Sequence, residues 1–113
     1  TNHCNATSTD LDKITEAVHT KRLVAGESWE AFAVGYEPLG NLQLQIEVTS
    51  NNSTISLLEM KSCRPSHEQN FYDTRYNEIR DSFIVPISSN CDDSFGGIWF
   101  FLLSCTSESP CTF

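Results

Sequence analysis

The sequence is poor in basic residues. Lysine and arginine number 7 against 15 aspartate and glutamate, which gives a net charge of −8. Proteins that bind nucleic acid or anionic membranes use Lys and Arg to displace counterions, so this balance argues against both partners. The longest apolar run, Gly96 to Leu103, is far short of the roughly 20 residues that span a bilayer. No basic and then apolar leader is present, and an opening at Thr1 fits a mature secreted chain, although a shortened chain would look the same.

Motifs that carry chemistry are missing as well. The sequence contains no CxxC pair and no GxSxG, and His3, His19 and His67 are scattered. The carboxylates form no isolated pair of the kind used in acid and base catalysis. Asp92 and Asp93 place oxygen ligands in one loop, where we weigh a weak calcium site against a solvated turn and prefer the turn. We therefore expect no enzyme, no metal site and no cofactor.

Five cysteines are present, which is many for a chain of 113 residues. Without a metal-binding spacing they indicate disulfides and an oxidising compartment. We predict a bond between Cys63 and Cys91, because each ends or follows a strand and the bond closes the long loop between them. A bond between Cys105 and Cys111 would hold the tail. Cys4 is then left as an unpaired or intermolecular thiol, although four cysteines permit three pairings and sequence alone does not choose among them.

Three asparagines, Asn5, Asn51 and Asn52, begin acceptor patterns for N-linked glycans. Asn51 and Asn52 fall in a polar turn, where a glycan would reach solvent. Glycans on both would crowd each other, so we expect at most one of the two to be modified. The protein is predicted to be a secreted glycoprotein.

The pattern of residues 42–63 organises the rest of the chain. Residues 42–49 alternate apolar and polar side chains, as a strand with one buried face does. Residues 51–53, Asn-Asn-Ser, suit a turn, and residues 54–63 resume an apolar strand. We expect these two strands to pair as a hairpin.

Other strands are predicted from apolar content and turn residues. They are residues 29–36, which would complete a three-stranded meander with the hairpin, residues 82–87, and residues 98–103. Pro86 places the strand of residues 82–87 at a sheet edge, or else marks the end of that strand. Residues 98–103 are apolar at every position, so both of their faces must be covered. Residues 64–81 have no periodicity and are expected to form a loop.

The N-terminal region is ambiguous. Residues 1–12 hold little to bury and are predicted to form an extended arm, with a single domain over residues 13–113. Thr9 and Asp12 resemble a helix capping box. The β-branched residues that follow favour instead a strand over residues 14–23.

About 6–8 short strands with regular turns predict an all-β fold, an antiparallel β-sandwich of jelly-roll or immunoglobulin-like type, stapled by disulfides. Over residues 20–105 the order GESWEAFAV, NLQLQIEV, TISLLEMKSC, long loop, strand and GIWFFLLSC resembles the small extracellular sandwich modules of the pre-peptidase C-terminal type. The acidic calcium-binding loop of some of those modules is missing. The resemblance implies a non-catalytic accessory or binding module.

One cluster is a candidate recognition surface, because aromatic and Arg side chains dominate the energy of interfaces. It comprises Phe71, Tyr72, Arg75, Tyr76 and Arg80. Its aromatic members suit equally a lid over the core.

The predicted function is self-association. Cys4 on its arm and an apolar groove or open sheet edge would join modules head to tail into an extracellular fibre, coat or matrix. The alternative is a ligand-binding or adhesion ectodomain. Expected partners are copies of the chain or other extracellular proteins, with N-linked glycans.

Overall fold

The computed structural model describes residues 4–15, 17–34, 42–87 and 97–113. The fold is nearly all β, as predicted, and no α-helix occurs in these ranges. The elements are β1 (Asp12–Lys13), β2 (Arg22–Leu23), β3 (Ser28–Val34), β4 (Leu42–Glu47), β5 (Ile55–Lys61), the 3-10 helix η1 (Glu68–Asn70), β6 (Thr74–Ile79), β7 (Ser82–Ile87), β8 (Ile98–Cys105) and β9 (Cys111–Thr112).

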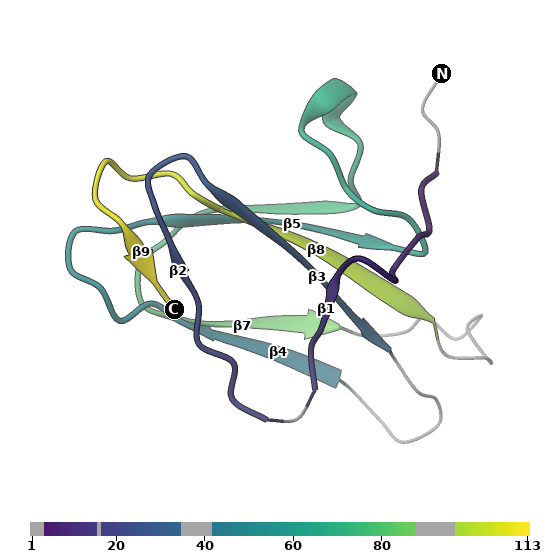
Figure 1. Ribbon diagram of the computed structural model, residues 1–113, viewed down its shortest axis with the longest axis horizontal. Helices are drawn as coiled ribbons and strands as arrows, with labels where there is room; N and C mark the ends of the chain where they lie inside the picture. The colour runs from purple at the N-terminus through teal and green to yellow at the C-terminus, as the bar shows by residue number, and fades with distance from the viewer. Residues whose placement is uncertain (1–3, 16, 35–41, 88–96) are drawn as a thin grey trace.

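The main sheet has five strands in the order β1-β3-β8-β5-β6. All of its pairings are antiparallel except that of β1 with β3, which is parallel, so the sheet is mixed rather than antiparallel throughout. Two further antiparallel pairs, β4-β7 and β2-β9, stand apart from it. In Figure 1 the arrows of β4 and β7 run together below the strands of the main sheet. The sheets do not close around the core.

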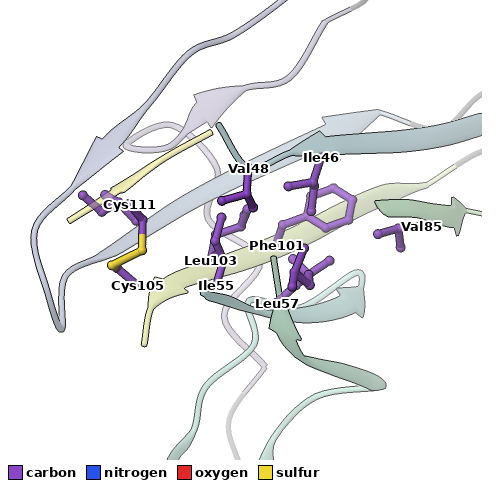
Figure 2. Close-up of a cluster of buried hydrophobic side chains, with 11 residues drawn as sticks. Ile46, Val48, Ile55, Leu57, Val85, Phe101, Leu103, Cys105 and Cys111 are labelled. Carbon is purple, nitrogen blue, oxygen red and sulfur yellow. A yellow bond between two sulfur atoms is a disulfide. The ribbon is translucent and has the colours of Figure 1, made fainter. Parts of the chain in front are cut away.

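The predicted hairpin of residues 42–63 does not form. β4 pairs with β7, whereas β5 pairs with β8 and β6, so the predicted three-stranded meander is also wrong. The turn residues instead carry the chain from one sheet to another, and Ile46 of β4 packs in one core cluster with Ile55 and Leu57 of β5 (Figure 2). An alternating pattern fixes which face of a strand is apolar. It does not fix whether two apolar faces lie side by side or face to face.

The core lies between β4-β7 and one face of the main sheet. Phe101 and Leu103 of β8 lie in its middle, Val85 of β7 lies toward one end, and the Cys105 to Cys111 disulfide closes the other end (Figure 2). Burying a large apolar side chain of this kind contributes roughly 1.5 to 3 kcal/mol relative to leaving it exposed. This cluster positions β4 against the main sheet and fixes the disulfide that was predicted for the tail.

β8 is the central strand and both of its faces are covered, as its continuous apolar sequence predicts. Phe101 and Leu103 face the core, and Phe100 and Leu102 on the opposite face are 1% and 9% exposed. On that opposite face Arg64, from the chain after β5, pairs with Glu30 of β3. Both edges of β8 are occupied, by β3 and β5, so this strand offers no free edge of its own.

Two segments differ from the sequence prediction. The strand expected over residues 14–23 is reduced to β2, and between residues 14 and 21 no described residue lies in a strand. β-branched residues favour a strand only where a neighbour pairs with them, and Val18 here is 93% exposed. Residues 64–81, expected to form a loop, contain β6. The sequence shows no strand periodicity there because the register of β6 on β5 is irregular and Glu78 has φ of 55°. β7 and its edge position agree with the prediction.

Candidate functional site: a groove beside β4

A groove of about 460 Å³ opens between β4 and residues 14, 15 and 17–20. This volume lies in the range of ligand sites in proteins, roughly 300 to 1,000 Å³. Trp29 and Leu103 line it from the main sheet, Leu44 and Ile46 line it from β4, and Phe113 lines it from the C-terminal segment. These side chains form a largely apolar surface assembled from β3, β8, β4 and the C-terminal segment, which no local sequence pattern indicates.

In the part of the chain that the structure describes, one edge of β4 faces this groove without a partner strand. Val48 donates its backbone N–H to Asp81 on the β7 side at 3.4 Å, whereas Thr49 donates its N–H to Thr112 of β9 on the other side at 2.9 Å. Backbone groups of successive strand residues point to opposite sides. Gln45 and Glu47 therefore share the direction of Thr49 and present their N–H and C=O groups to the groove. Within the described residues β4 pairs with β7 alone.

The other sheet edges are protected in ways that β4 is not. β1 is two residues long, β6 carries the irregularity at Glu78, and β7 carries Pro86, which has no N–H. Short strands, bulges and proline all discourage the addition of another strand. β4, with the sequence LQLQIE, has no Lys, no Pro and no irregularity of register on β7. Its free edge is thus suited to pairing.

Trp29 is held in place at the mouth of the groove. Its indole N–H donates to Asp12 at 2.6 Å, Lys21 lies 3.2 Å from the same carboxylate, and the Lys21 ammonium sits 5.2 Å from the centre of the indole ring. The hydrogen bond from Trp29, and then the contact and charge of Lys21, hold the pKa of Asp12 below its ordinary value. The ring of Phe113 lies 6.1 Å from that of Trp29. An aromatic wall fixed in this way is preorganised for binding.

The N-terminal arm is tethered to the body, contrary to prediction. Cys4 is bonded to Cys63, so the predicted bond between Cys63 and Cys91 is wrong and Cys4 is not an unpaired thiol. The N–H of Arg64 donates to the carbonyl of Asn5 at 2.7 Å. Cys91 lies outside the described residues. The arm lacks apolar anchors, and sequence reasoning missed that polar contacts bring it to this place.

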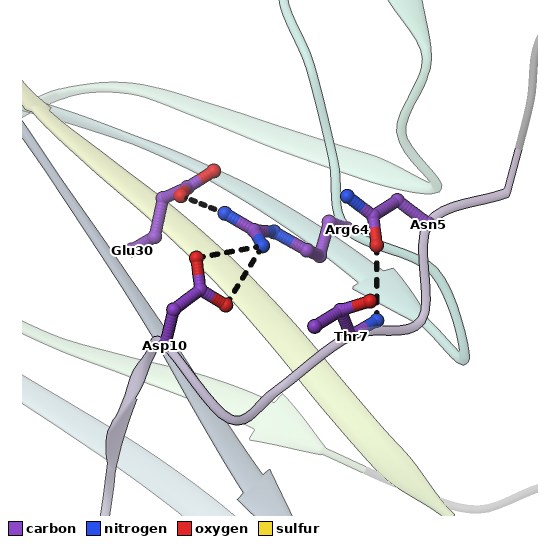
Figure 3. A network of polar contacts seen from close by, with 5 residues as sticks. All are labelled: Asn5, Thr7, Asp10, Glu30 and Arg64. Carbon is purple, nitrogen blue, oxygen red and sulfur yellow. Dashed lines mark hydrogen bonds and ion pairs between the residues drawn. The ribbon is translucent and has the colours of Figure 1, made fainter.

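Arg64 is the centre of those polar contacts. Its guanidinium, with a side chain 16% exposed, reaches both Asp10 of the arm and Glu30 of β3 (Figure 3). Burial opposes the charged form, but the hydrogen bonds and charges of Glu30 and Asp10 outweigh it and raise the pKa of Arg64. The arm thereby lies against the face of the main sheet that is turned away from the core.

The predicted recognition surface is only partly assembled. Arg75, Tyr76 and Arg80 line a second, more open depression of about 550 Å³ along β6 and the start of β7. Phe71 and Tyr72 lie outside its lining, in the half-buried chain after η1. The Tyr76 ring packs edge-on against Phe83 at 5.0 Å, which ties it to the core as the lid interpretation predicts. Glu78 and Asp81 line the same depression, so its charges are mixed.

One buried carboxyl stands out. Glu59 lies on the core face of β5 and is 5% exposed, and its Oε2 has no hydrogen-bond partner among the described residues. Desolvation, and then the charge of Asp73, raise the pKa of Glu59 to about 7. Tyr76 from β6 also faces it, and Lys61 follows on the same face of β5. Its burial keeps this carboxyl out of reach of a substrate, so it bears on stability rather than on catalysis.

The remaining predicted positions are scattered. His19 contacts Thr15 at the rim of the groove, His67 is exposed before η1, and His3 falls outside the described residues, as does the Asp92 and Asp93 loop. Within the described ranges no group of three or more His, Cys, Asp or Glu could hold a metal ion. No helix in these ranges is long and apolar enough to cross a membrane.

The glycosylation candidates lie at the surface. Asn51 and Asn52 are exposed in the turn between β4 and β5, and Asn52 adopts φ of 55°. Asn5 is exposed on the arm, where its side-chain oxygen accepts the N–H of Thr7 (Figure 3).

No family model, no curated protein and no solved structure matches this chain.

Proposed function

We propose that this chain is a non-catalytic extracellular binding module and that the groove beside β4 is its ligand site. The observation that carries the proposal is the conjunction of an open apolar groove with the unprotected edge of β4. Sites of this kind combine an apolar lining with a few polar groups that fix the ligand. Here the polar groups are the backbone N–H and C=O of Gln45 and Glu47, and the fixed ring of Trp29 completes the site.

An extracellular location is supported by the two disulfides, which favour an oxidising environment. We include in the proposal secretion and a glycan at Asn5 and at one of Asn51 or Asn52. All three side chains are exposed, and none lines the groove.

The architecture we propose is an open β-sandwich, with β4-β7 as a short second layer on the main sheet. The shared core cluster of Ile46, Val85, Leu57 and Phe101 supports it. The likeness to pre-peptidase C-terminal modules stays a prediction that agrees with a binding role.

Self-association is the second candidate function. It loses the support of a free Cys4, because that residue is bonded within the chain. It keeps one favourable observation, since an unprotected edge such as that of β4 also pairs with copies of itself. Fibre, coat or matrix formation would then proceed from the β4 edge rather than from the arm.

Two variants of Ala17, an exposed residue that lines the groove, test the proposed function. Nile red, a neutral apolar dye, should bind one site on the native chain and increase in fluorescence. Ala17→Trp fills the groove and should abolish binding, whereas the matched control Ala17→Ser should preserve it. Equal dye binding by both variants contradicts the assignment of the groove. Sedimentation over a concentration series separates the two functions, since a monomer at all concentrations removes self-association.

A further inference from the structure

Main-chain groups of β4 that have no partner among the described residues face the groove. A pocket for a compact ligand does not need such groups. Gln45 and Glu47 point their N–H and C=O groups into the groove, and Thr49, next on the same side, already pairs with Thr112 of β9 at 2.9 Å. β9 therefore pairs with this edge of β4 only at Thr49. Among the described residues, nothing pairs with the edge at Gln45 and Glu47.

We propose that an extended segment of a partner polypeptide adds to β4 as a new strand in this groove. The inference rests on the proposed function and names the class of ligand. The segment continues the pairing that begins at Thr112, and its backbone pairs with Gln45 and Glu47. Strand addition of this kind draws affinity from main-chain hydrogen bonds and specificity from alternate side chains.

The lining determines the side chains of the segment. Successive side chains of a strand point to opposite faces, so every second residue faces the apolar lining formed by Trp29, Leu103 and Phe113. The residues between them face outward, where Glu47 is exposed. No Lys or Arg in the described part of the chain forms a salt bridge with Glu47. The segment is therefore alternately apolar and carries a Lys or Arg opposite Glu47.

Charge selects a foreign partner over a second copy. Each copy carries a net charge of −8, so two copies repel each other as they approach, whereas a basic segment is attracted.

Selection from a library of random nine-residue peptides on the native chain tests this inference. The peptides recovered should have apolar residues at alternate positions and a Lys or Arg, and they should displace Nile red. A scan of the best peptide with single N-methyl groups is the decisive step, because an N-methyl group removes one main-chain donor. Methylation of the amides that face β4 should weaken binding roughly tenfold or more, and methylation one residue along should have little effect.

Two variants of Gln45 provide the matched comparison from the protein side. Gln45→Pro removes the N–H that faces the groove and should reduce the affinity for the peptide by a similar factor. Gln45→Thr keeps that N–H and should bind as the native chain does. The N-methyl scan uses the native chain alone, so it decides the question even if Gln45→Pro does not fold.

Uniform effects of N-methylation along the peptide overturn strand addition. A failure to recover any peptide that competes with Nile red overturns it too, while one-site dye binding that is lost in Ala17→Trp leaves the proposed function standing. If the selected peptides lack a basic residue, the partner is not the basic segment proposed here. If the native chain forms a homodimer that the peptide dissociates, the partner is a second copy of the chain.

Discussion

Cys4 in the N-terminal arm is bonded to Cys63 just beyond β5, 59 residues along the chain. Beside this bond the N–H of Arg64 donates to the carbonyl of Asn5, and the Arg64 guanidinium contacts Asp10 and Glu30. One covalent bond and one cation thus hold an arm that has little apolar surface of its own. The arm leads into β1, which pairs with β3 at the edge of the main sheet.

Loss of the Cys4 to Cys63 bond should destabilise the protein strongly. By the chain-entropy model a closed loop of this length stabilises the fold by about 4 kcal/mol, compared with about 2 kcal/mol for the six-residue separation of Cys105 and Cys111. The double variant Cys4→Ser/Cys63→Ser should therefore unfold at much lower urea concentration than the native chain. Trypsin should also cut after Lys13 once the arm is released. An unchanged urea midpoint together with a resistant arm would contradict the described anchoring.

Glu59 should make the protein less stable as the pH rises. The folded-state pKa of about 7 exceeds the ordinary value of 4.5, so between these values the folded state keeps a proton that the unfolded state has lost. The free energy of unfolding should fall through this window by about 3 kcal/mol and level off above it. Glu59→Gln should match the native chain near pH 4 and exceed its stability at pH 8.

Urea unfolding at pH 4 to 8 measures this difference, with the exposed Glu108→Gln as the control. The control should follow the native chain over the whole range. A Glu59→Gln curve parallel to the native one would show that the buried carboxyl carries no such pH dependence.

A glycan at Asn52 or Asn51, and another at Asn5, should be found on protein from its native source. Asn52 is the better site of the adjacent pair, because Ser53 in the Asn51 acceptor pattern is buried and its hydroxyl donates to the carbonyl of Ser50 at 2.8 Å. Intact mass before and after endoglycosidase treatment should differ by two glycans. Asn52→Gln should remove one of them, and an unchanged mass in every case would refute the assignment.

The sequence predicts several strands of this fold but not how they pair. Val85 and Phe101 fall in strands that their apolar content identifies, and the bond between Cys105 and Cys111 follows from their proximity in sequence. The pairing of β4 with β7 depends on which apolar faces meet in three dimensions, and a periodicity of two carries no such information. The Cys4 to Cys63 bond depends on polar contacts made by Arg64, which leave no hydrophobic signature.

The groove could not be predicted for the same reason. Trp29, Leu44, Leu103 and Phe113 are far apart in the chain and each belongs to a segment with its own local pattern. Only the three-dimensional arrangement of the described residues reveals that β4 has a free edge and that residues 14, 15 and 17–20 lie across the groove from it. The prediction of an apolar groove or open edge was general, and its place at β4 is a result of the structure.

The most direct test of the central claim is the solvent exchange of four backbone amides of the free protein, followed residue by residue by nuclear magnetic resonance. Leu44 and Ile46 point to β7 and should exchange slowly, whereas Gln45 and Glu47 point to the groove and should exchange fast. On addition of a peptide selected from the library, Gln45 and Glu47 should become slow as well. Slow exchange of Gln45 and Glu47 in the free monomer would contradict the account, because the edge of β4 would then already be paired.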